Sequence, residues 1–226
     1  MTVANRAARK RRIFVVDDHP LVRDGFRSIL NEEPDLVVCG EAAEGAAALA
    51  SIPSLRPDLI LVDISLGNGS GLELLKDLAI RHPSIPVLVV SMHDEAIYAD
   101  RVLRAGARGY LMKVESSQRL LGAIRRVLEG KVFVSESVMT SIASKLGQHK
   151  GDLQPIGRLS DRELQVFELI GNGLSTSEIA QRMHLSIKTI QAYVARPKEK
   201  FGVLTLRELL REALRWHESP KGIRRG

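Results

Sequence analysis

Residues 59–75 read LILVDISLGNGSGLELL, and the order of residue types in this stretch decides the expected fold. Four aliphatic residues in a row, Leu59–Val62, are typical of a strand that is buried on both faces of a sheet. Asp63 ends this run, a loop rich in glycine follows, and the amphipathic segment Leu72–Arg81 then indicates a helix. The stretch therefore predicts a strand, a loop and a helix, with a carboxylate at the end of the strand.

The same alternation of short apolar runs and helix-length amphipathic segments continues over the first 130 residues. The apolar runs are Ile13–Val16, Leu36–Val38, Leu59–Val62, Val87–Val90 and Gly109–Met112. The amphipathic segments are Leu21–Leu30, Gly45–Leu55, Leu72–Arg81, Ala96–Ala105 and Gln118–Leu128. We therefore expect an α/β domain with a doubly wound, five-stranded parallel sheet of the flavodoxin-like type, in which each strand is buried on both faces.

Composition and the single cysteine indicate the cellular compartment. Hydrophobic residues make up 44% of the chain, and the only cysteine, Cys39, lies in the apolar run LVVCG. One buried thiol fits a reducing cytosol. No apolar run approaches the roughly 18 residues of a transmembrane helix, and the basic N-terminus precedes too few apolar residues for a signal peptide. We expect a cytoplasmic protein with no membrane partner.

Charge is distributed unevenly along the chain, whose net charge is +6. Residues 156–226 carry 13 basic and eight acidic residues, whereas residues 13–155 carry 15 basic and 19 acidic residues. A basic C-terminal segment beside an acidic body favours contact with a polyanion such as double-stranded DNA. A basic surface that is only solvated would explain the same charge equally well.

Polar side chains follow four of the five apolar runs. They are Asp17 and Asp18 after the first run, Asp63 after the third, Ser91 after the fourth and Lys113 after the fifth. Because the carboxyl ends of parallel strands meet at one edge of a sheet, these side chains are expected to lie together. A single aspartate after a strand is commonly a helix cap, but five such side chains at one edge indicate a functional site.

The residue types assign a chemistry to this edge. Three carboxylates repel one another unless a cation joins them, and oxygen ligands without His or Cys suit Mg²⁺. A carboxylate beside Mg²⁺ can attack phosphorus, while a lysine and a serine hydroxyl hold the phosphoryl oxygens. The sequence therefore predicts a magnesium-dependent site that accepts a phosphoryl group on an aspartate.

Four stretches resemble the receiver domains of bacterial two-component response regulators of the NarL/FixJ type. They are FVVDDHPLVRDG, LILVDISLGNGSGLELL, VLVVSMHDE and ARGYLMK, within about residues 12–130. The resemblance implies that Asp63 accepts the phosphoryl group from a sensor histidine kinase, and that the protein catalyses only its own phosphoryl transfer and dephosphorylation. It implies Asp17, Asp18, Asp63 and the backbone carbonyl of Ser65 around Mg²⁺, and catalytic or switching roles for Ser91, Tyr110 and Lys113.

Two other classes of protein use a similar edge. Phosphatases of the haloacid dehalogenase type also have an aspartate nucleophile at a strand end, but they carry a second aspartate two residues on, where this chain has Ser65. A flavodoxin-like mononucleotide binder needs a loop that cradles phosphate after the first strand, whereas DDHPLVRDG offers carboxylates, which repel phosphate. The residues therefore favour a receiver over both alternatives.

Residues 159–216 are helical in pattern and are divided by helix caps. The caps are two capping boxes, Ser160 with Glu163 and Ser175 with Glu178, and a third serine, Ser186. The third cap follows a tight turn and opens the helix IKTIQAYVARPKEKFG. A helix, a tight turn and a second helix predict a helix-turn-helix, although a plain three-helix bundle would show the same caps.

The motifs LSDREL, GLSTSEIA and LSIKTIQAY resemble the LuxR-type DNA-binding domain over about residues 156–218. The resemblance implies that the helix after Ser186 lies in the major groove of DNA. It also implies that the last helix, Leu206–Trp216, joins a homodimer when the protein is phosphorylated, although the apolar stripe of this helix could equally serve its own domain. Residues 131–155 are expected to be a linker with a helical segment near Ser137–Leu146.

The residues expected to contact DNA follow from which side of the recognition helix is buried. With Ile187, Ile190 and Val194 expected in the core, the opposite side faces DNA. Glutamine can read adenine and alanine can touch a thymine methyl group, whereas contacts to phosphate position the protein without specifying sequence. The expected DNA-binding residues are Thr176, Lys188 and Thr189 at phosphates, Gln191, Ala192 and Ala195 near base edges, and the outward-facing Arg196.

Pro197 lies on the apolar stripe of this predicted recognition helix. Inside a helix, proline removes one hydrogen bond and crowds the preceding turn, at a cost of about 3 kcal/mol or more. We therefore expect a helix that is intact through about Ala195 and then kinks or stops. The expected function is a phosphorylation-controlled DNA-binding transcriptional regulator. The alternative is a receiver protein with a weakened output domain that acts as a phosphate sink or a protein-binding switch.

Overall fold

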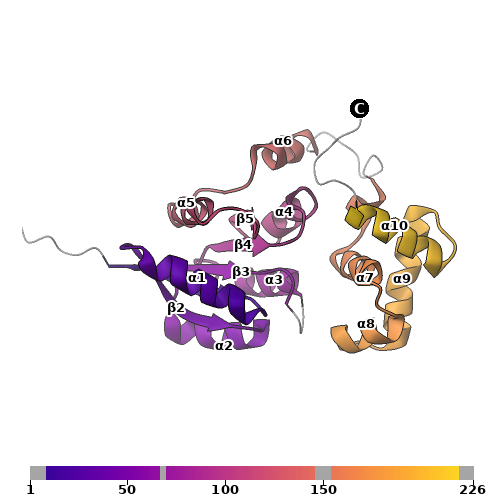
Figure 1. Cartoon of the computed structure of the whole chain (residues 1–226), viewed down its shortest axis with the longest axis horizontal. Helices are drawn as coiled ribbons and strands as arrows, with labels where there is room; N and C mark the ends of the chain where they lie inside the picture. Colours follow the sequence, from indigo (N-terminus) through magenta and orange to yellow (C-terminus); the bar gives the residue numbers. More distant parts are fainter. Residues whose placement is uncertain (1–8, 67–69, 146–153, 219–226) are drawn as a thin grey trace, which may run out of the picture. The chain divides into compact units, whose positions relative to one another are not determined.

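The computed structural model describes residues 9–66, 70–145 and 154–218, in two compact units divided after Ile142 (Figure 1). The first unit contains a β-sheet and helices, and the described part of the second contains only helices. The boundaries predicted for the two domains, at 12–130 and 156–218, stay predictions. Part of the predicted linker, residues 146–153, lies outside the described residues.

The sheet of the first unit has five parallel strands in the order β2-β1-β3-β4-β5. The strands are β1 (Arg11–Val16), β2 (Leu36–Ala42), β3 (Leu59–Val62), β4 (Val87–Ser91) and β5 (Gly109–Met112). The strand order reverses at β1, as in a doubly wound sheet, so the predicted fold class is confirmed. Pairing places Val16 level with Val62, and the residues after β1 and β3 therefore leave the sheet at the same edge.

Five helices cover the two faces of this sheet. They are α1 (Pro20–Glu32), α2 (Gly45–Leu55), α3 (Gly71–Arg81), α4 (Glu95–Arg104) and α5 (Ser117–Leu128). Leu30 of α1 and Ile124 of α5 share one buried cluster with Ile13, Leu61 and Leu111 of the sheet. Because parallel crossovers are right-handed, α2, α3 and α4 lie on the opposite face.

The edge strand β2 differs from the expectation that every strand is buried on both faces. Only Leu36 and Ala42 of this strand are buried, and the residues between them are half-buried. Cys39, expected to be buried, is therefore half-buried, and this burial is still enough to raise the pKa of its thiol. An edge strand has a neighbour on one side only, so fewer side chains cover it.

Two glycines allow close approaches around the sheet. A Cβ at Gly71 would lie 2.5 Å from the backbone oxygen of Asp63, so glycine lets α3 begin directly against the loop after β3. A Cβ at Gly109 would lie 2.7 Å from the backbone oxygen of Phe133, a residue beyond α5 that pairs with the free edge of β5. Tyr110 N–H donates to Phe133 O at 2.8 Å, and Phe133 N–H donates to Arg108 O at 3.0 Å. The chain therefore covers the edge of β5 with its own residue Phe133. The helix α6 (Glu136–Lys145) begins after this residue and confirms the predicted helical segment near Ser137.

Within residues 154–218, the second unit contains a short 3₁₀ helix and four α-helices. They are η2 (Pro155–Arg158), α7 (Asp161–Gly171), α8 (Thr176–Met183), α9 (Ile187–Phe201) and α10 (Leu206–Glu218). Both predicted capping boxes are present, and Ser186 accepts from Thr189 N–H as predicted. His184, in the left-handed conformation at φ 53°, ends α8 and makes the tight turn into α9. No helix in the described ranges is both long and apolar enough to cross a membrane.

The core of the second unit is centred on Phe167 of α7. Its ring stacks on Phe201 of α9 with ring centroids 4.8 Å apart and lies 5.9 Å from the ring of Trp216 of α10. Leu209 and Ala213 of α10 are fully buried. Part of the apolar stripe of α10 therefore serves the domain's own core, while Leu206 and Leu214 remain substantially exposed.

The structure corrects two expectations about α9. The helix was expected to kink or stop after about Ala195; it does not stop but continues to Phe201, with Pro197 buried inside it, and the kink stays a prediction. Proline has a φ that suits a helix, and the turn after Pro197 is held from outside. Lys200 Nζ donates to Glu163 Oε2 at 2.5 Å and to Arg158 O at 3.0 Å, and the stacking of Phe201 on Phe167 adds apolar contact. These tertiary contacts explain how the helix passes the proline.

The second error concerns Ile187, which was expected in the core. Its side chain is 48% exposed, whereas Ile190 and Val194 are buried as predicted. Ile187 is the first residue of α9, directly after the cap, where the helix has not yet packed against its neighbours. Helical spacing therefore identified the stripe but not where its burial begins.

Candidate functional site

Asp17, Asp63 and Lys113 meet at the carboxyl edge of the sheet, although they lie far apart in the sequence. Lys113 Nζ lies 2.6 Å from Asp17 Oδ2 and 2.6 Å from Asp63 Oδ2. Both carboxylates are almost fully buried. Burial acts to lower the pKa of Lys113, but the adjacent Asp17 and Asp63 carboxylates outweigh it and raise this pKa above the ordinary value. The lysine is therefore positively charged between two carboxylates.

Asp18 and His19 complete a cluster of possible ligands with Asp17 and Asp63. One ligand atom from each of the four residues lies within 4.8 Å of the others. His19 Nδ1 is 2.7 Å from Asp18 Oδ1 and 3.4 Å from Asp17 Oδ1. Sequence reasoning selected the carboxylates and missed His19, although its position directly after Asp17-Asp18 was the signal available.

The cluster fits a hard divalent cation. Asp17 Oδ2 and Asp18 Oδ1 are buried and accept no well-directed hydrogen bond, although Lys113 and His19 nitrogens lie close to them. Carboxylate oxygens with spare lone pairs at one point are the ligands that Mg²⁺ prefers. The Ser65 N–H donates to Asp63 Oδ1 at 3.2 Å. The predicted role of the Ser65 carbonyl as a ligand stays a prediction.

Ser91, Tyr110 and His93 connect this cluster to the loop after β4. Ser91 is fully buried, and its Oγ accepts a long hydrogen bond of 3.4 Å from His93 N–H. The Tyr110 hydroxyl donates to His93 O at 2.8 Å, and burial raises the pKa of this hydroxyl well above its ordinary value. His93 Nε2 lies 2.6 Å from Ser65 Oγ. His93, which sequence reasoning missed, therefore contacts both the loop after Asp63 and the predicted switch residue.

These contacts define what the edge can do chemically. Asp63 presents a carboxylate whose two oxygens are contacted by Ser65 N–H and Lys113. A carboxylate in this position can act as a nucleophile toward phosphorus, and a lysine can stabilise negative charge on the transferred group.

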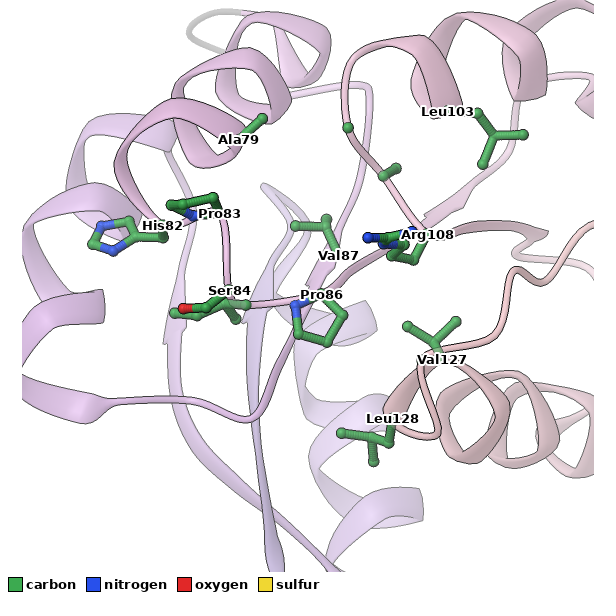
Figure 2. A pocket seen from close by; sticks show the side chains of 14 residues that line it. Ala79, His82, Pro83, Ser84, Pro86, Val87, Leu103, Arg108, Val127 and Leu128 are labelled. Carbon is green, nitrogen blue, oxygen red and sulfur yellow. The ribbon is translucent and has the colours of Figure 1, made fainter.

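A cavity of about 500 Å³ lies elsewhere in the same unit (Figure 2). It is lined by the end of α3, the loop before β4 and the residues before β5, including His82, Pro86 and Arg108. Val87 is the first residue of β4, so the cavity lies at the amino ends of the strands. It is therefore separate from the carboxylate cluster at the opposite edge.

The predicted DNA-binding residues lie on α8 and α9 of the second unit. Lys188, Gln191, Ala192, Ala195 and Arg196 are exposed, whereas Thr176 and Thr189 are half-buried. Thr189 Oγ1 lies 2.8 Å from Ser186 Oγ, so this threonine also takes part in the cap of α9. Arg196 Nη1 lies 3.9 Å from the buried Glu163. The structure therefore places five of the seven residues on an exposed helix face, and their contacts to DNA stay predictions.

Comparisons with known proteins cover both units. Residues 13–125 match the response regulator receiver domain, and residues 157–213 match the bacterial regulatory proteins of the luxR family. The oxygen regulatory protein NreC of Staphylococcus aureus is 34% identical over 210 residues, which cover 90% of this chain and 97% of NreC.

Solved structures of RcsB, a response regulator, are also similar to the chain. One from Salmonella typhimurium has a TM-score of 0.71 and 26% identity, covering 91% of this chain and 98% of RcsB. Another, from Salmonella enterica serovar Typhimurium and bound to a promoter with phosphomimetic BeF₃⁻, has a TM-score of 0.67 and 27% identity, covering 90% and 98%. The similarity therefore extends over a receiver and an output domain in one chain.

Proposed function

Since the chain belongs to the response regulators, phosphorylation-dependent transcriptional regulators that here join a receiver to a luxR-type DNA-binding domain, we propose that Asp63 is its phosphoacceptor. The observation that carries this assignment is the position of Asp63. Its carboxylate contacts Lys113 and Ser65 N–H, beside the Asp17-Asp18 pair at the carboxyl edge of the sheet. The donor is the phosphohistidine of a sensor histidine kinase.

The transfer moves a phosphoryl group from nitrogen to oxygen. A bond forms between an Asp63 oxygen and phosphorus, and the bond between phosphorus and the kinase's histidine nitrogen breaks. That nitrogen keeps the electron pair. Asp17, Asp18, Asp63 and the Ser65 carbonyl would hold Mg²⁺, which supplies charge neutralisation for the carboxylates and the phosphoryl oxygens.

The residues around Asp63 then bind the phosphoryl group on Asp63 and change position in response to it. Lys113 is already charged and directed at Asp63 Oδ2, so it contacts an oxygen of the new phosphoryl group. Ser91 offers a buried hydroxyl on the neighbouring strand. Tyr110 is bound to the backbone of His93 in the loop after Ser91, and a shift of this loop therefore changes the position of the tyrosine.

The second unit binds double-stranded DNA through α9. Lys188, Gln191, Ala192, Ala195 and Arg196 form an exposed face, with Thr176 at the first residue of α8. The RcsB complexes with DNA, one of them with promoter DNA, support this role. A structure of two RcsB dimers bound to two parallel DNAs supports a homodimer, which we assign to the phosphorylated form. The protein catalyses only its own phosphoryl transfer and dephosphorylation, and it works in the cytoplasm, where bacterial DNA lies.

The alternative is a receiver protein with a weakened output domain. The continuation of α9 to Phe201 through the buried Pro197 gives no structural reason for such a weakening. DNA binding is therefore the function that the second unit supports best.

The test combines phosphoryl labelling with DNA titration. The full chain should take up label from a small phosphodonor, and both Asp63→Asn and removal of Mg²⁺ with EDTA should abolish stable labelling. The phosphodonor should change the affinity of the wild type for promoter DNA but not that of Asp63→Asn. Wild-type labelling kinetics in Asp63→Asn would show that another residue is the acceptor.

A further inference from the structure

We propose that Arg23 is a positioning residue for Mg²⁺, because it holds the peptide bond between Asp17 and Asp18; this inference rests on the proposed phosphorylation site. Arg23 lies in α1, outside the cluster of ligand atoms. Its side chain is 18% exposed and is directed toward the loop that follows β1.

The contact that carries the proposal is made to the backbone. Arg23 Nη1 donates to Asp17 O at 2.6 Å. That carbonyl belongs to the peptide unit whose other end is the nitrogen of Asp18. Because a peptide unit is planar, the direction of its carbonyl fixes the direction of the following Cα. Arg23 therefore restrains the point from which the Asp18 side chain leaves the backbone.

Two other hydrogen bonds hold the loop on either side of this peptide unit. Asp17 N–H donates to Ala42 O at 3.1 Å, which continues the pairing of β1 with β2. His19 N–H donates to Asp17 Oδ1 at 2.9 Å. Neither bond involves the carbonyl between Asp17 and Asp18. The bond from Arg23 therefore supplies a restraint that these two do not.

Glu41 on β2 anchors the guanidinium group. Arg23 Nε lies 3.5 Å from Glu41 Oε2, and Arg27 Nε donates to Glu41 Oε1 at 2.7 Å. A planar guanidinium group can face a carboxylate and a carbonyl at the same time, which an ammonium group does with less fixed geometry. Arg27 shares the same carboxylate, and its guanidinium donates to Glu41 and Asp24, so it is a matched control on the same helix.

The charge of Arg23 and its proposed positioning of Asp18 predict opposite effects on Mg²⁺ binding when the side chain is removed. If Arg23 acted only through its positive charge, removing it would strengthen the binding of a cation to nearby carboxylates. If Arg23 positions Asp18, removing it weakens binding, because residues that orient metal ligands typically contribute about 10–100-fold to metal affinity. The sign of the change therefore separates the two roles.

The experiment is a calorimetric titration of Mg²⁺ into the full, unphosphorylated chain. We expect Arg23→Met to raise the Mg²⁺ dissociation constant by about tenfold or more, and Arg27→Met to leave it within about twofold of the wild type. Thermal melts in EDTA identify any loss of folded protein. If Arg23→Met is not folded, Arg23→Lys replaces it. We expect Arg23→Lys to raise the Mg²⁺ dissociation constant by at least about threefold, because an ammonium group lacks the planar set of N–H donors of a guanidinium group.

Three outcomes would overturn the proposal. They are tighter or unchanged Mg²⁺ binding in the folded Arg23 variant, an equal weakening in Arg27→Met, and wild-type affinity in Arg23→Lys when it is the variant used. Phosphoryl labelling of the wild type, with its loss in Asp63→Asn, is measured on the same preparations. If the wild type is labelled and the Arg23 variant binds Mg²⁺ as tightly as the wild type, only the positioning role is rejected. If the wild type neither takes up label nor binds Mg²⁺, the proposed function is rejected as well.

Discussion

The two regions proposed to carry function hold their charged side chains in opposite ways. At the carboxyl edge of the sheet, the side chains of Asp17, Asp63 and Lys113 are 1%, 3% and 9% exposed. On α9, by contrast, Lys188 is exposed and the side chain of Arg196 is 69% exposed. The groups at the sheet edge are held by one another, whereas the reading face of α9 is presented to solvent by a helix whose other side is packed.

This difference determines how function and stability are connected in each region. Buried charges depend on their partners, because removing one partner leaves another charge without compensation in a poorly solvated place. Exposed charges on a helix contribute little to folding, since water solvates them whether or not the chain is folded. We therefore expect substitutions at the sheet edge to alter folding and chemistry together, and substitutions on the face of α9 to alter binding alone.

The largest effect on stability is expected from Lys113→Met. Without the ammonium group, the buried Asp17 and Asp63 carboxylates face each other, which should lower the free energy of unfolding of the first unit by about 3 kcal/mol. Mg²⁺ should restore part of this loss, because a cation again joins the carboxylates. Calorimetric unfolding in EDTA and in Mg²⁺ measures both effects.

Lys131→Met is the matched control for this experiment. Lys131 is exposed and pairs only at the surface with Glu129, so its removal should change the free energy of unfolding by less than about 1 kcal/mol. Equal destabilisation by the two substitutions would break the distinction between buried and exposed charge.

Features set by local pattern or by sheet topology could be predicted from the sequence. Strand runs such as Leu59–Val62 and caps such as Ser160 with Glu163 are local patterns, and the structure confirms them. The meeting of Asp17, Asp63 and Lys113 was also predictable, because parallel strands carry their carboxyl ends to one edge. The fold and the main site residues therefore follow from local pattern and a general rule of topology.

Contacts between separate elements were not predictable in this way. His93 approaches Ser65 because of how two loops pack, and Lys200 reaches Glu163 across the second unit. The expectation that α9 ends near Ala195 failed because it used the local cost of proline and omitted this tertiary support. Ile187 was misplaced because helical spacing describes a direction around the axis and not the packing at each turn.

The next largest effect on stability is expected from a substitution on the buried side of α9. Pro197→Ile restores a backbone N–H that can donate to Tyr193 O, and we expect it to raise the free energy of unfolding of the second unit by about 2 kcal/mol. DNA affinity and its salt dependence should not change, because residue 197 does not lie on the reading face. Calorimetry of the full chain and DNA titrations measure the two quantities. An unchanged or lower unfolding temperature would mean that the surrounding residues have adapted to proline.

A smaller effect is expected from Glu163, a buried carboxylate that supports α9. Burial acts to raise the pKa of Glu163, but hydrogen bonds from Lys200 and Ser160 outweigh it and lower this pKa below its ordinary value of 4.5. The contribution of Glu163 to stability is therefore fully present above pH 4.5 and is lost as the pH falls through the lowered value. Glu163→Gln should cost about 1–2 kcal/mol at pH 7, since Lys200 is partly exposed.

The pH dependence of this difference is the decisive measurement for Glu163. Unfolding of the second unit is compared between wild type and Glu163→Gln from pH 7 to pH 3. The difference should be constant down to about pH 4.5 and should shrink below it, because the carboxylate then takes up a proton in the unfolded chain before it does so in the folded one. A difference that persists unchanged at pH 3 would mean that the packing of the side chain, and not its charge, supports α9.

The smallest effect on stability is expected on the reading face itself. Lys188→Ala and Gln191→Ala should each change the free energy of unfolding by less than about 0.5 kcal/mol, because both side chains are exposed.

The effects of these two substitutions on DNA binding should differ from each other. Lys188→Ala removes a phosphate contact and should weaken binding about equally on all sequences, reducing the salt slope by roughly one unit. Gln191→Ala removes a base contact and should cost about 1–3 kcal/mol at one base pair. Titrations on specific and scrambled duplexes at several salt concentrations distinguish these results, and identical behaviour of the two variants would remove the assignment of separate roles along α9.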